Sequence, residues 1–408
     1  MSQTTTERFN LLTLEALTNP YPVLQDMRQE EPIYWSDQLH SWVLTRFRDV
    51  QSVLRDPRSS VDRSELLAYL LTPEQRTELE PLHELMRRWP VFRDPPSHTR
   101  VRSLIAGAVT PRAIATLRPR MEALANELIN AVAAKGHMDL MADFAQPFAT
   151  VITAEMLGAN PADRPLFKSW LEDIEPLIQN RLDYESQLQV HRGISSMTNY
   201  FRRLLESEPE RMKDTMLGGL INMRVENEQL SLDDALGCTA LFMFAGQPAS
   251  ADLIALSILT LGQYPDQLAQ LVANPTLIPA AIEEVIRFDG PILCLGRTPK
   301  EPMQIDSVTI QPGQSMLLHV GAANRDPEQF PDPERFDINR PEPRHVGFGH
   351  GAHYCIGSAL ARLEGQVALE VLLRRLPNLR LGATPPQPKP MLMMRSLHSL
   401  HVEFDPVS

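Results

Sequence analysis

A cysteine within a glycine-rich segment is the residue of this chain best suited to chemistry. Three glycines precede Cys355 within nine residues, and Gly357 follows it two residues later. Helical spacing begins at about residue 357, so the cysteine is expected at the positive end of a helix, which favours thiolate over thiol. Backbone N–H groups of the first helical turn are also expected to hydrogen-bond the sulfur. The segment therefore predicts a thiolate presented by a tight loop.

The residues alone leave other interpretations of Cys355 open. It could be a buried, inert cysteine beside a turn. It could also be the nucleophile of a Cys-His enzyme, because His353 is close in sequence. Residues two apart, however, do not face each other on a helix. Gly357 leaves space on the helix for a flat ligand, and Phe348 could pack beside the sulfur and exclude water.

Two further pairs of residues have a spacing that puts both side chains on one face of a helix. Glu284 and Arg287 are three residues apart, and His98 and Arg102 are four apart. Two donor or cationic groups such as His98 and Arg102 suit a carboxylate ligand. The alternative interpretations are a surface ion pair that contributes little and a solvated basic helix face.

The elements that must position these residues are mostly helical. A helix is predicted to begin at Thr110-Pro111, with the threonine as cap, and helical spacing continues from Met121 to Val132. Further helices are predicted over 146–158, 190–206, 213–223, 232–264, 278–288 and about 357–375. The most apolar stretch, 235–262, contains Gln247, Pro248 and Asp252, so it is interpreted as a buried helix and not a membrane span.

The predicted strands are few. Residues 32–45 are expected to form a small hairpin, and residues 303–320 a second β-rich patch with turns at Asp306-Ser307 and Pro312-Gly313. Residues 324–350 are predicted to be irregular. The chain is therefore expected to be mainly α with a minor β portion, and nothing marks a boundary that would divide residues 1–408 into more than one domain.

Composition and charge exclude several classes of protein. The formal net charge of −12 argues against nucleic acid as a partner. The three cysteines form no CxxC pair, which argues against a disulfide framework or a structural zinc site and favours a reducing compartment. The N-terminus lacks the basic region and apolar run of a signal peptide. These features predict a soluble cytoplasmic protein without a membrane anchor.

The segment from Phe348 to Gly357 resembles the haem-binding loop of cytochromes P450, FGxGxHxCxG, at every defined position. The resemblance implies the cytochrome P450 fold, a helical prism with a small β-rich side. It also implies that the chain binds haem b (iron protoporphyrin IX) through the thiolate of Cys355. Phe348, His353 and Gly357 would then be further haem contacts, with His353 at a propionate.

Other segments are similar to motifs of the same family and occur in the family's order. Residues 94–102 resemble the DPPxHTRxR segment of bacterial members, which would place His98 and Arg102 at a haem propionate. Arg297 matches a further family position that contacts a propionate. Such donors are expected, because a haem carboxylate buried without a partner would be costly.

Glu284 and Arg287 match the family's ExxR motif, and Pro333-Glu334-Arg335-Phe336 matches its PERF-like segment. The resemblance implies that Glu284, Arg287 and Arg335 form a buried network behind the haem loop. Their predicted role is structural.

The chain departs from the family in its long apolar helix. Where members usually read AGx(D/E)T(T/S), this sequence has Pro248 for the acid and Ala249 for the threonine, while Ser250 keeps the next hydroxyl. The usual acid–alcohol pair for proton delivery is therefore missing. Pro248 has no N–H and clashes with the carbonyl of Phe244, so a kink or opening of the helix is predicted there. The candidate catalytic residues are Ala245, Gly246, Gln247, Ala249 and Ser250.

The function implied by the resemblance is insertion of one oxygen atom from O2 into an apolar small molecule. Protons would come through water, Gln247, Ser250 or a substrate hydroxyl. A polyketide, macrolide, terpenoid or fatty acyl chain would suit such a site. Because of Pro248-Ala249, a peroxide-driven reaction remains an alternative, as does an unusual one such as rearrangement, dehydration or coupling. A non-catalytic haem-binding sensor is an alternative of another class.

The implied partners are a ferredoxin and a ferredoxin reductase, because no flavin or iron–sulfur motif is present in the chain. They are expected to dock near Cys355, with Arg344 and Arg362 as candidate contacts, and the protein is expected to be a monomer. An apolar pocket is predicted from residues 60–93, 241–249, 292–295 and 391–394. Its candidate lining residues are Trp89, Val91, Phe92, Leu241, Ala245, Ile292, Leu293, Leu295, Met393 and Met394.

Overall fold

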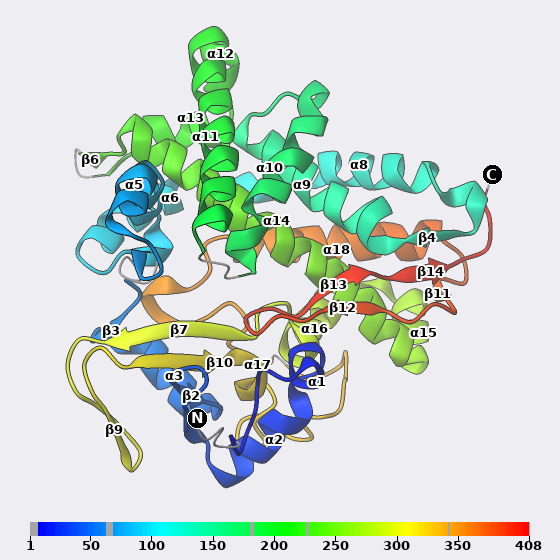
Figure 1. Ribbon diagram of the computed structural model, residues 1–408. Coiled ribbons are helices and arrows are strands. Elements are labelled where there is room, and N and C mark those ends of the chain that lie inside the picture. Colours follow the sequence, from blue (N-terminus) through cyan, green and yellow to red (C-terminus); the bar gives the residue numbers. More distant parts are fainter. Residues whose placement is uncertain (1–6, 63–67, 180–182, 226–227, 342, 408) are drawn as a thin grey trace.

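The computed structural model describes residues 7–62, 68–179, 183–225, 228–341 and 343–407, and most of them are helical. The longer helices gather on one side of the molecule and the main sheet lies on the other (Figure 1). The helices are α1 (Leu14–Thr18), α2 (Tyr21–Glu30), α3 (Phe47–Arg55), α5 (Pro73–Arg87), α6 (Ser97–Ala108), α7 (Pro111–Ala115), α8 (Arg118–Asn130), α9 (Gln146–Leu157), α10 (Arg164–Ile178), α11 (Tyr184–Ser207), α12 (Pro209–Met212), α13 (Met216–Asn222), α14 (Leu232–Gln263), α15 (Pro265–Ala273), α16 (Ile278–Asp289), α17 (Val320–Ala323) and α18 (Ser358–Arg375).

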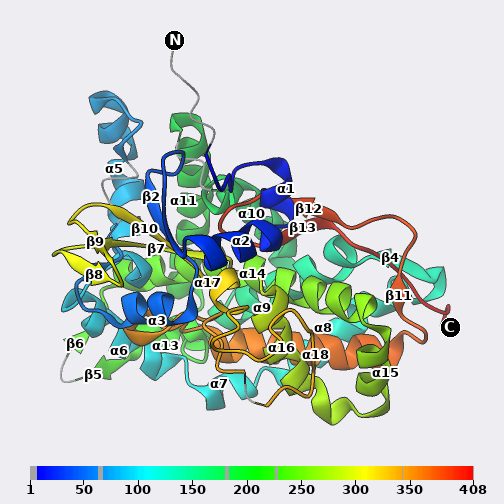
Figure 2. The ribbon, with the colours of Figure 1, turned by 90° about the horizontal axis from the view of Figure 1, so that it is seen from below.

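The helix α14 is the centre of the helical side. It packs against α9, α11, α16 and α18, and its apolar residues belong to the two largest core clusters. Seen from below, α18 runs beside α8 and α16 (Figure 2). The helix is long and apolar enough to cross a membrane, but 67% of its apolar window is buried inside the protein. It is therefore a core helix, as the sequence predicts for residues 235–262.

The strands form one five-stranded sheet and several small ones. The main sheet has the order β1-β2-β10-β7-β3, in which β2 and β10 run parallel and the other pairs antiparallel. Its register joins Leu44 to Leu318 and Leu318 to Leu295. The strands are β1 (Ile33–Ser36), β2 (Ser41–Leu44), β3 (Ser59–Ser60), β4 (His137–Asp139), β5 (Arg224–Val225), β6 (Glu228–Gln229), β7 (Cys294–Pro299), β8 (Met303–Ile305), β9 (Val308–Ile310), β10 (Ser315–His319), β11 (Arg380–Leu381), β12 (Gln387–Lys389), β13 (Ser396–Ser399) and β14 (His401–Glu403).

The mainly α fold with a small β side is as predicted, and so are the hairpin of β1 and β2 and the strands β8, β9 and β10. The helix predicted to begin at Thr110 is shorter than the sequence indicates. Thr110 does cap α7, but α7 ends at Ala115 and a new helix, α8, begins at Arg118. Pro119 explains the break, because proline cannot donate to the carbonyl four residues before it and its ring crowds that carbonyl.

Pro248 does not divide the long helix. The backbone of α14 is helical at every residue from Leu232 to Gln263, with Pro248 inside it. Pro248 therefore does not interrupt the helix, although the missing N–H of Pro248 leaves the Phe244 carbonyl without its usual donor four residues later. The physical reason is packing. Neighbouring helices pack against α14 along its length, and the free energy of this packing outweighs the local cost of one proline.

Candidate active site

The loop that carries Cys355 lies between a single 3₁₀ turn, Gly351–His353, and the start of α18. The backbone N–H of Cys355 donates to the carbonyl of Phe348 at 2.9 Å, which closes the loop. Gly349 and Gly351 have φ angles of 72° and 73°, a region that favours glycine. A Cβ on Gly351 would also lie 2.6 Å from the carbonyl oxygen of Leu54. The glycine spacing therefore reflects a backbone shape that other residues cannot adopt without strain.

The sulfur of Cys355 is surrounded by donors but is also deeply enclosed. Burial raises the pKa of the Cys355 thiol, while a hydrogen bond from the Gly357 N–H and the charges of Arg102 and Arg362 lower it. Burial dominates, so the pKa of the thiol is raised overall, although the N–H at the start of the helix lowers it in the predicted direction. Ionisation then requires a stronger positive charge at the sulfur, such as a metal ion. A Cβ on Gly357 would lie 3.9 Å from the sulfur, so this glycine keeps the approach open.

Four basic side chains gather beside this loop. The rings of His98, on α6, and His353 lie with their centroids 4.0 Å apart. Burial, with the charges of His98, Arg297 and Arg102, lowers the pKa of His353 to about 3. Arg102 donates to the carbonyl of Tyr354, and Arg297 projects from β7. Among the described residues, nothing bonds the buried Nδ1 of His98. The structure thus brings together all four residues that the sequence assigns to an anionic group.

Behind the loop, Glu284 and Arg287 of α16 form a buried ion pair. Arg287 Nε and Nη2 donate to the two carboxylate oxygens of Glu284 at 2.7 and 2.8 Å, and both residues are 1% exposed. Arg287 also donates to the carbonyls of Asn324, Pro333 and Arg335. A buried pair is stable only when its remaining donors are satisfied, and here they tie down the irregular segment 324–340.

The prediction that the Arg335 side chain is the third member of this network is wrong. The Arg335 side chain is 65% exposed and points to Asp337 at 3.7 Å, so it contributes only its backbone carbonyl. Arg340 takes the place instead: its Nε donates to Glu284 at 3.2 Å, and its other nitrogens donate to the carbonyls of Pro331, Asp332 and Arg335. Asp332 has a φ of 47°, and its carbonyl accepts from the Arg335 N–H at 3.0 Å, so the chain turns just before Arg335.

On α14, Ala245 is exposed although it lies within the most buried helix of the protein. One turn further on, the hydroxyl of Ser250 donates to the carboxyl of Glu364, a fully buried residue of α18. Burial raises the pKa of Glu364 to about 8, against the weaker opposite effect of the Ser250 hydrogen bond. Gln247 is also buried. Ser250 therefore contacts a carboxyl group that holds its proton at neutral pH.

Sequence reasoning missed Glu364. A signal for it was present: Leu360, Glu364, Val367 and Val371 lie on one face of the last predicted helix, and all but Glu364 are apolar. A charged residue at a core position of an amphipathic helix indicates either a buried partner or a shifted pKa. In this structure Glu364 has both.

The predicted pocket residues fall into distinct environments. The segments 292–295 and 391–394 do lie together, because Ile292 bridges to Met394 and the N–H of Leu293 donates to the carbonyl of Met393 at 2.9 Å. Leu295 lies beside the cysteine loop, 3.7 Å from the position of a Cβ on Gly349. The partly buried members are Phe92, Ile292, Leu295, Met393 and Met394.

Three other members are core residues, and one is at the surface. Trp89 and Leu241 belong to the cluster that also contains the partly buried Ile356, the neighbour of Cys355. Leu293 is 2% exposed and packs with residues of α2. Val91 is 43% exposed and does not belong to any of the described core clusters.

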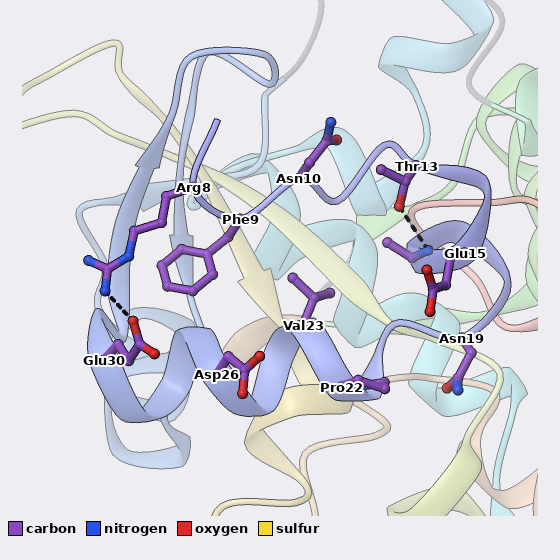
Figure 3. A pocket seen from close by; sticks show the side chains of 11 residues that line it. Arg8, Phe9, Asn10, Thr13, Glu15, Asn19, Pro22, Val23, Asp26 and Glu30 are labelled. Carbon is purple, nitrogen blue, oxygen red and sulfur yellow. Dashed lines mark hydrogen bonds and ion pairs between the residues drawn. The ribbon is translucent and has the colours of Figure 1, made fainter. Parts of the chain in front are cut away.

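A separate cavity of about 430 Å³ lies near the N-terminus (Figure 3). It is open to solvent and is lined by residues of the segment 8–19 and of α2, and none of its lining residues is among the predicted site residues. Its walls carry Arg8, Glu15, Asp26 and Glu30, and Arg8 is already bonded to Glu30. These charges do not suit the apolar pocket that the sequence predicts.

The two arginines predicted at a docking surface differ in their availability. Arg344 is exposed. Arg362 donates to both carboxylate oxygens of Glu283 at 2.6 and 2.9 Å, and its guanidinium lies 4.4 Å from the centre of the Phe348 ring. Burial alone would raise the pKa of Glu283, but hydrogen bonds from His345 and Arg362 lower it to about 2. Arg362 therefore holds the loop in place more than it offers charge to a partner.

Comparison with known proteins agrees with this architecture. The sequence pattern of the family described as "Cytochrome P450" matches residues 269–402. The chain is 33% identical to the biotin biosynthesis cytochrome P450 of Bacillus subtilis, over 96% of this chain and 98% of that protein. It is also 33% identical to the cytochrome P450 monooxygenase PikC of Streptomyces venezuelae, over 95% of this chain and 91% of that one.

A solved structure is similar over almost its full length. P450BioI, in complex with a hexadec-9Z-enoic acid ligated acyl carrier protein, matches with a TM-score of 0.86 and 32% identity, over 96% of this chain and 99% of that one. The chain belongs to the cytochrome P450 family, whose members are haem-thiolate proteins. It is a cytochrome P450 monooxygenase that binds haem through a cysteine thiolate.

The residues present fit such a haem. The orphan Nδ1 of His98 and the gathered donors Arg102, Arg297 and His353 form the kind of site that a propionate carboxylate satisfies. The glycine at position 357 leaves room at the sulfur for a flat group. Neither Cys238 nor Cys294 offers such surroundings, because both are buried inside core clusters.

Proposed function

We propose that this enzyme inserts one oxygen atom from O2 into an apolar small molecule, with Cys355 as the iron ligand. The haem supplies the oxygen chemistry when bound. His98, Arg102, Arg297 and His353 would bind the propionates and fix the orientation of the ring. The substrate class proposed is a fatty acyl, polyketide, macrolide or terpenoid molecule. The apolar side chains of the predicted pocket support this choice, and so does the acyl group carried by the complex of the related P450BioI.

The observation that carries the proposal is the buried pair of Ser250 and Glu364. Activation of dioxygen consumes protons, whereas peroxide brings its own. Although the usual acid and threonine are replaced by Pro248 and Ala249, Glu364 holds a proton at neutral pH, and the Ser250 hydroxyl is in contact with it. We propose that Glu364 is the proton reservoir and that Ser250 passes the proton toward the exposed side of Ala245. This favours O2 over peroxide as the oxidant.

The electron donors proposed are a separate ferredoxin and ferredoxin reductase, docking near the cysteine loop with Arg344 as a candidate contact. We further propose that residues 1–408 form one haem domain that acts as a monomer in the cytoplasm. The burial of α14 in the protein core is in keeping with this location.

Replacing Ser250 with alanine is expected to lower product formation supported by ferredoxin, its reductase and NAD(P)H by roughly tenfold or more, because proton supply limits that route. Product formation supported by hydrogen peroxide should change little. The two assays are compared on the same fatty acyl and macrolide substrates, with labelled dioxygen to identify the source of the inserted atom.

Ser257→Ala is the matched control, since this buried serine of α14 donates only to its own helix, at the carbonyl of Leu253. It should behave as wild type in both assays. Equal losses in the two assays for Ser250→Ala, or product oxygen that does not come from dioxygen, would overturn the proposed function.

The stability of the protein should depend on pH through Glu364. Its pKa is raised from 4.5 to about 8 in the folded state, so between these values the folded state holds a proton that the unfolded chain has lost. The free energy of unfolding therefore falls as pH rises across this window, by at most about 1.4 kcal/mol per pH unit from this group. Glu364→Gln removes this contribution, so its stability relative to wild type should increase from pH 5 to pH 8.

Urea unfolding at several pH values measures this difference. A constant difference between Glu364→Gln and wild type over that range would mean that Glu364 is ionised in the folded protein, and the proposed proton reservoir would be lost.

A further inference from the structure

A second buried carboxyl lies on α14, about two turns beyond Ala245. Asp252 is 2% exposed. Burial raises the pKa of Asp252 to about 7, and the hydrogen bonds from Ser396 and Leu397 only partly offset this effect. Burying an acid is costly, and an apolar side chain at such a position is often neutral or stabilising. Asp252 is therefore better explained by what it binds than by what it adds to stability.

Asp252 joins α14 to the strand β13. Its Oδ1 accepts from the Ser396 hydroxyl at 2.9 Å and from the Leu397 N–H at 3.4 Å. Ser396 and Leu397 are the first two residues of β13, and both are buried. The strand packs on α14 (Figure 1). One carboxyl oxygen thus binds both a side chain and the backbone at the start of this strand.

The chain just before β13 is held from another direction by α16. Arg395 donates from Nε to Oδ1 of Asp289 at 3.2 Å, and its backbone N–H donates to the carbonyl of Pro291 at 2.8 Å. Neighbouring side chains of an extended segment point to opposite faces. Arg395 and Ser396 therefore reach different helices, so this part of the chain is attached to both α16 and α14.

The segment attached in this way leads directly into the predicted pocket. The carbonyl of Met393 accepts from the N–H of Leu293 at 2.9 Å, and Met394 forms a β-bridge with Ile292. Met393, Met394 and Ile292 are partly buried. A shift of β13 along α14 would therefore move the two methionines, and with them one wall of the predicted pocket.

We propose that Asp252 is a positioning residue that sets where Met393 and Met394 lie against α14, and so how well the pocket accepts a long apolar chain. This inference rests on the apolar pocket of the proposed function, to which it adds a residue that shapes the wall. The carboxyl acts through Ser396 and Leu397, and no covalent bond changes. Without it, the segment is attached to α16 alone and can shift across α14.

The test compares how the haem-loaded protein binds two probes, imidazole and N-dodecylimidazole, each titrated by the shift of the haem absorption band. Imidazole needs only the iron, whereas the dodecyl chain also contacts the pocket, so the ratio of the two dissociation constants reports the pocket wall. Asp252→Leu removes the acceptor and should lower the preference for the dodecyl probe by roughly fivefold or more, because a displaced wall loses apolar contacts. Asp252→Asn keeps an acceptor oxygen and should stay within about twofold of wild type.

Ser396→Ala removes one of the two donors and should shift the ratio in the same direction as Asp252→Leu. Combining the two substitutions should add nothing further, because both remove the same contact. Thr239→Val is the matched control, since this buried hydroxyl of α14 donates to the carbonyl of Ala235 on its own helix. It should keep the wild-type ratio.

An unchanged ratio in Asp252→Leu, or additive effects of Asp252→Leu and Ser396→Ala, overturns the inference. If Asp252→Leu does not bind haem, an unchanged ratio in Ser396→Ala overturns it instead. Wild-type protein that binds the two probes equally well contradicts the apolar pocket, and the inference with it. If the ratio shifts as expected but no substrate is oxidised with dioxygen, the role of Asp252 stands and the proposed function fails.

Discussion

Cys355→Ala is expected to give folded protein that binds no haem and shows no red-shifted carbon monoxide band. The physical reason is that neither of the other two cysteines can take its place, because Cys238 and Cys294 are both buried inside core clusters. The donors His98, Arg102, Arg297 and His353 can bind carboxylates but offer no thiolate. Absorption spectra of the purified variant, with and without carbon monoxide, measure the result.

Cys238→Ala provides the control, because it makes the same replacement in a buried cysteine of α14. This variant should keep its haem and the red-shifted band. Far-ultraviolet circular dichroism separates loss of haem from loss of fold in both variants. A Cys355→Ala protein that kept the band would show that another residue ligates the iron.

Arg340→Ala is expected to lower the free energy of unfolding by about 3 kcal/mol, whereas Arg335→Ala should change it by no more than about 0.5 kcal/mol. The first substitution removes a 10%-exposed guanidinium that bonds to Glu284 and to three backbone carbonyls. The second removes a side chain that is mostly in solvent. Urea unfolding of the two variants, with haem bound in each, makes the comparison.

Each variant is the control for the other, because both remove an arginine from the same irregular segment behind the haem loop. If Arg335→Ala proved the more destabilising, the buried network would contain the residue that the sequence predicts, and the placement of the Arg340 side chain would be wrong.

The chemistry of the site could be predicted from the sequence where backbone shape dictates residue type. The positive φ angles of the cysteine loop require glycine at positions 349 and 351, so the loop can be recognised from the sequence alone. The mainly helical fold can be predicted from the sequence too, because the apolar stretch of α14 is longer than a strand and fits a buried helix. The pairing of β2 with β10, 274 residues apart at Ser41 and Ser315, carries no comparable local signal.

The rest depended on how side chains meet in space. Arg340 reaches Glu284, whereas the PERF-like segment of the sequence points to Arg335, whose side chain is exposed. The sequence does not predict Glu364 as a site residue, because the apolar spacing of its helix indicates core positions on that face. Its partner, Ser250, is 114 residues away in the chain, so only the packing of α14 on α18 reveals the pair.

The helix α18 begins three residues after Cys355 and carries Glu364 about 9 Å further along its axis. The same helix therefore follows directly on the cysteine loop and carries the buried carboxyl of Glu364. A displacement of this helix, whether from a docked electron donor or from a substitution at its ends, would move the iron ligand and the proton reservoir by the same amount. In the proposed mechanism, a partner that displaces this helix would therefore act on electron entry and proton supply together.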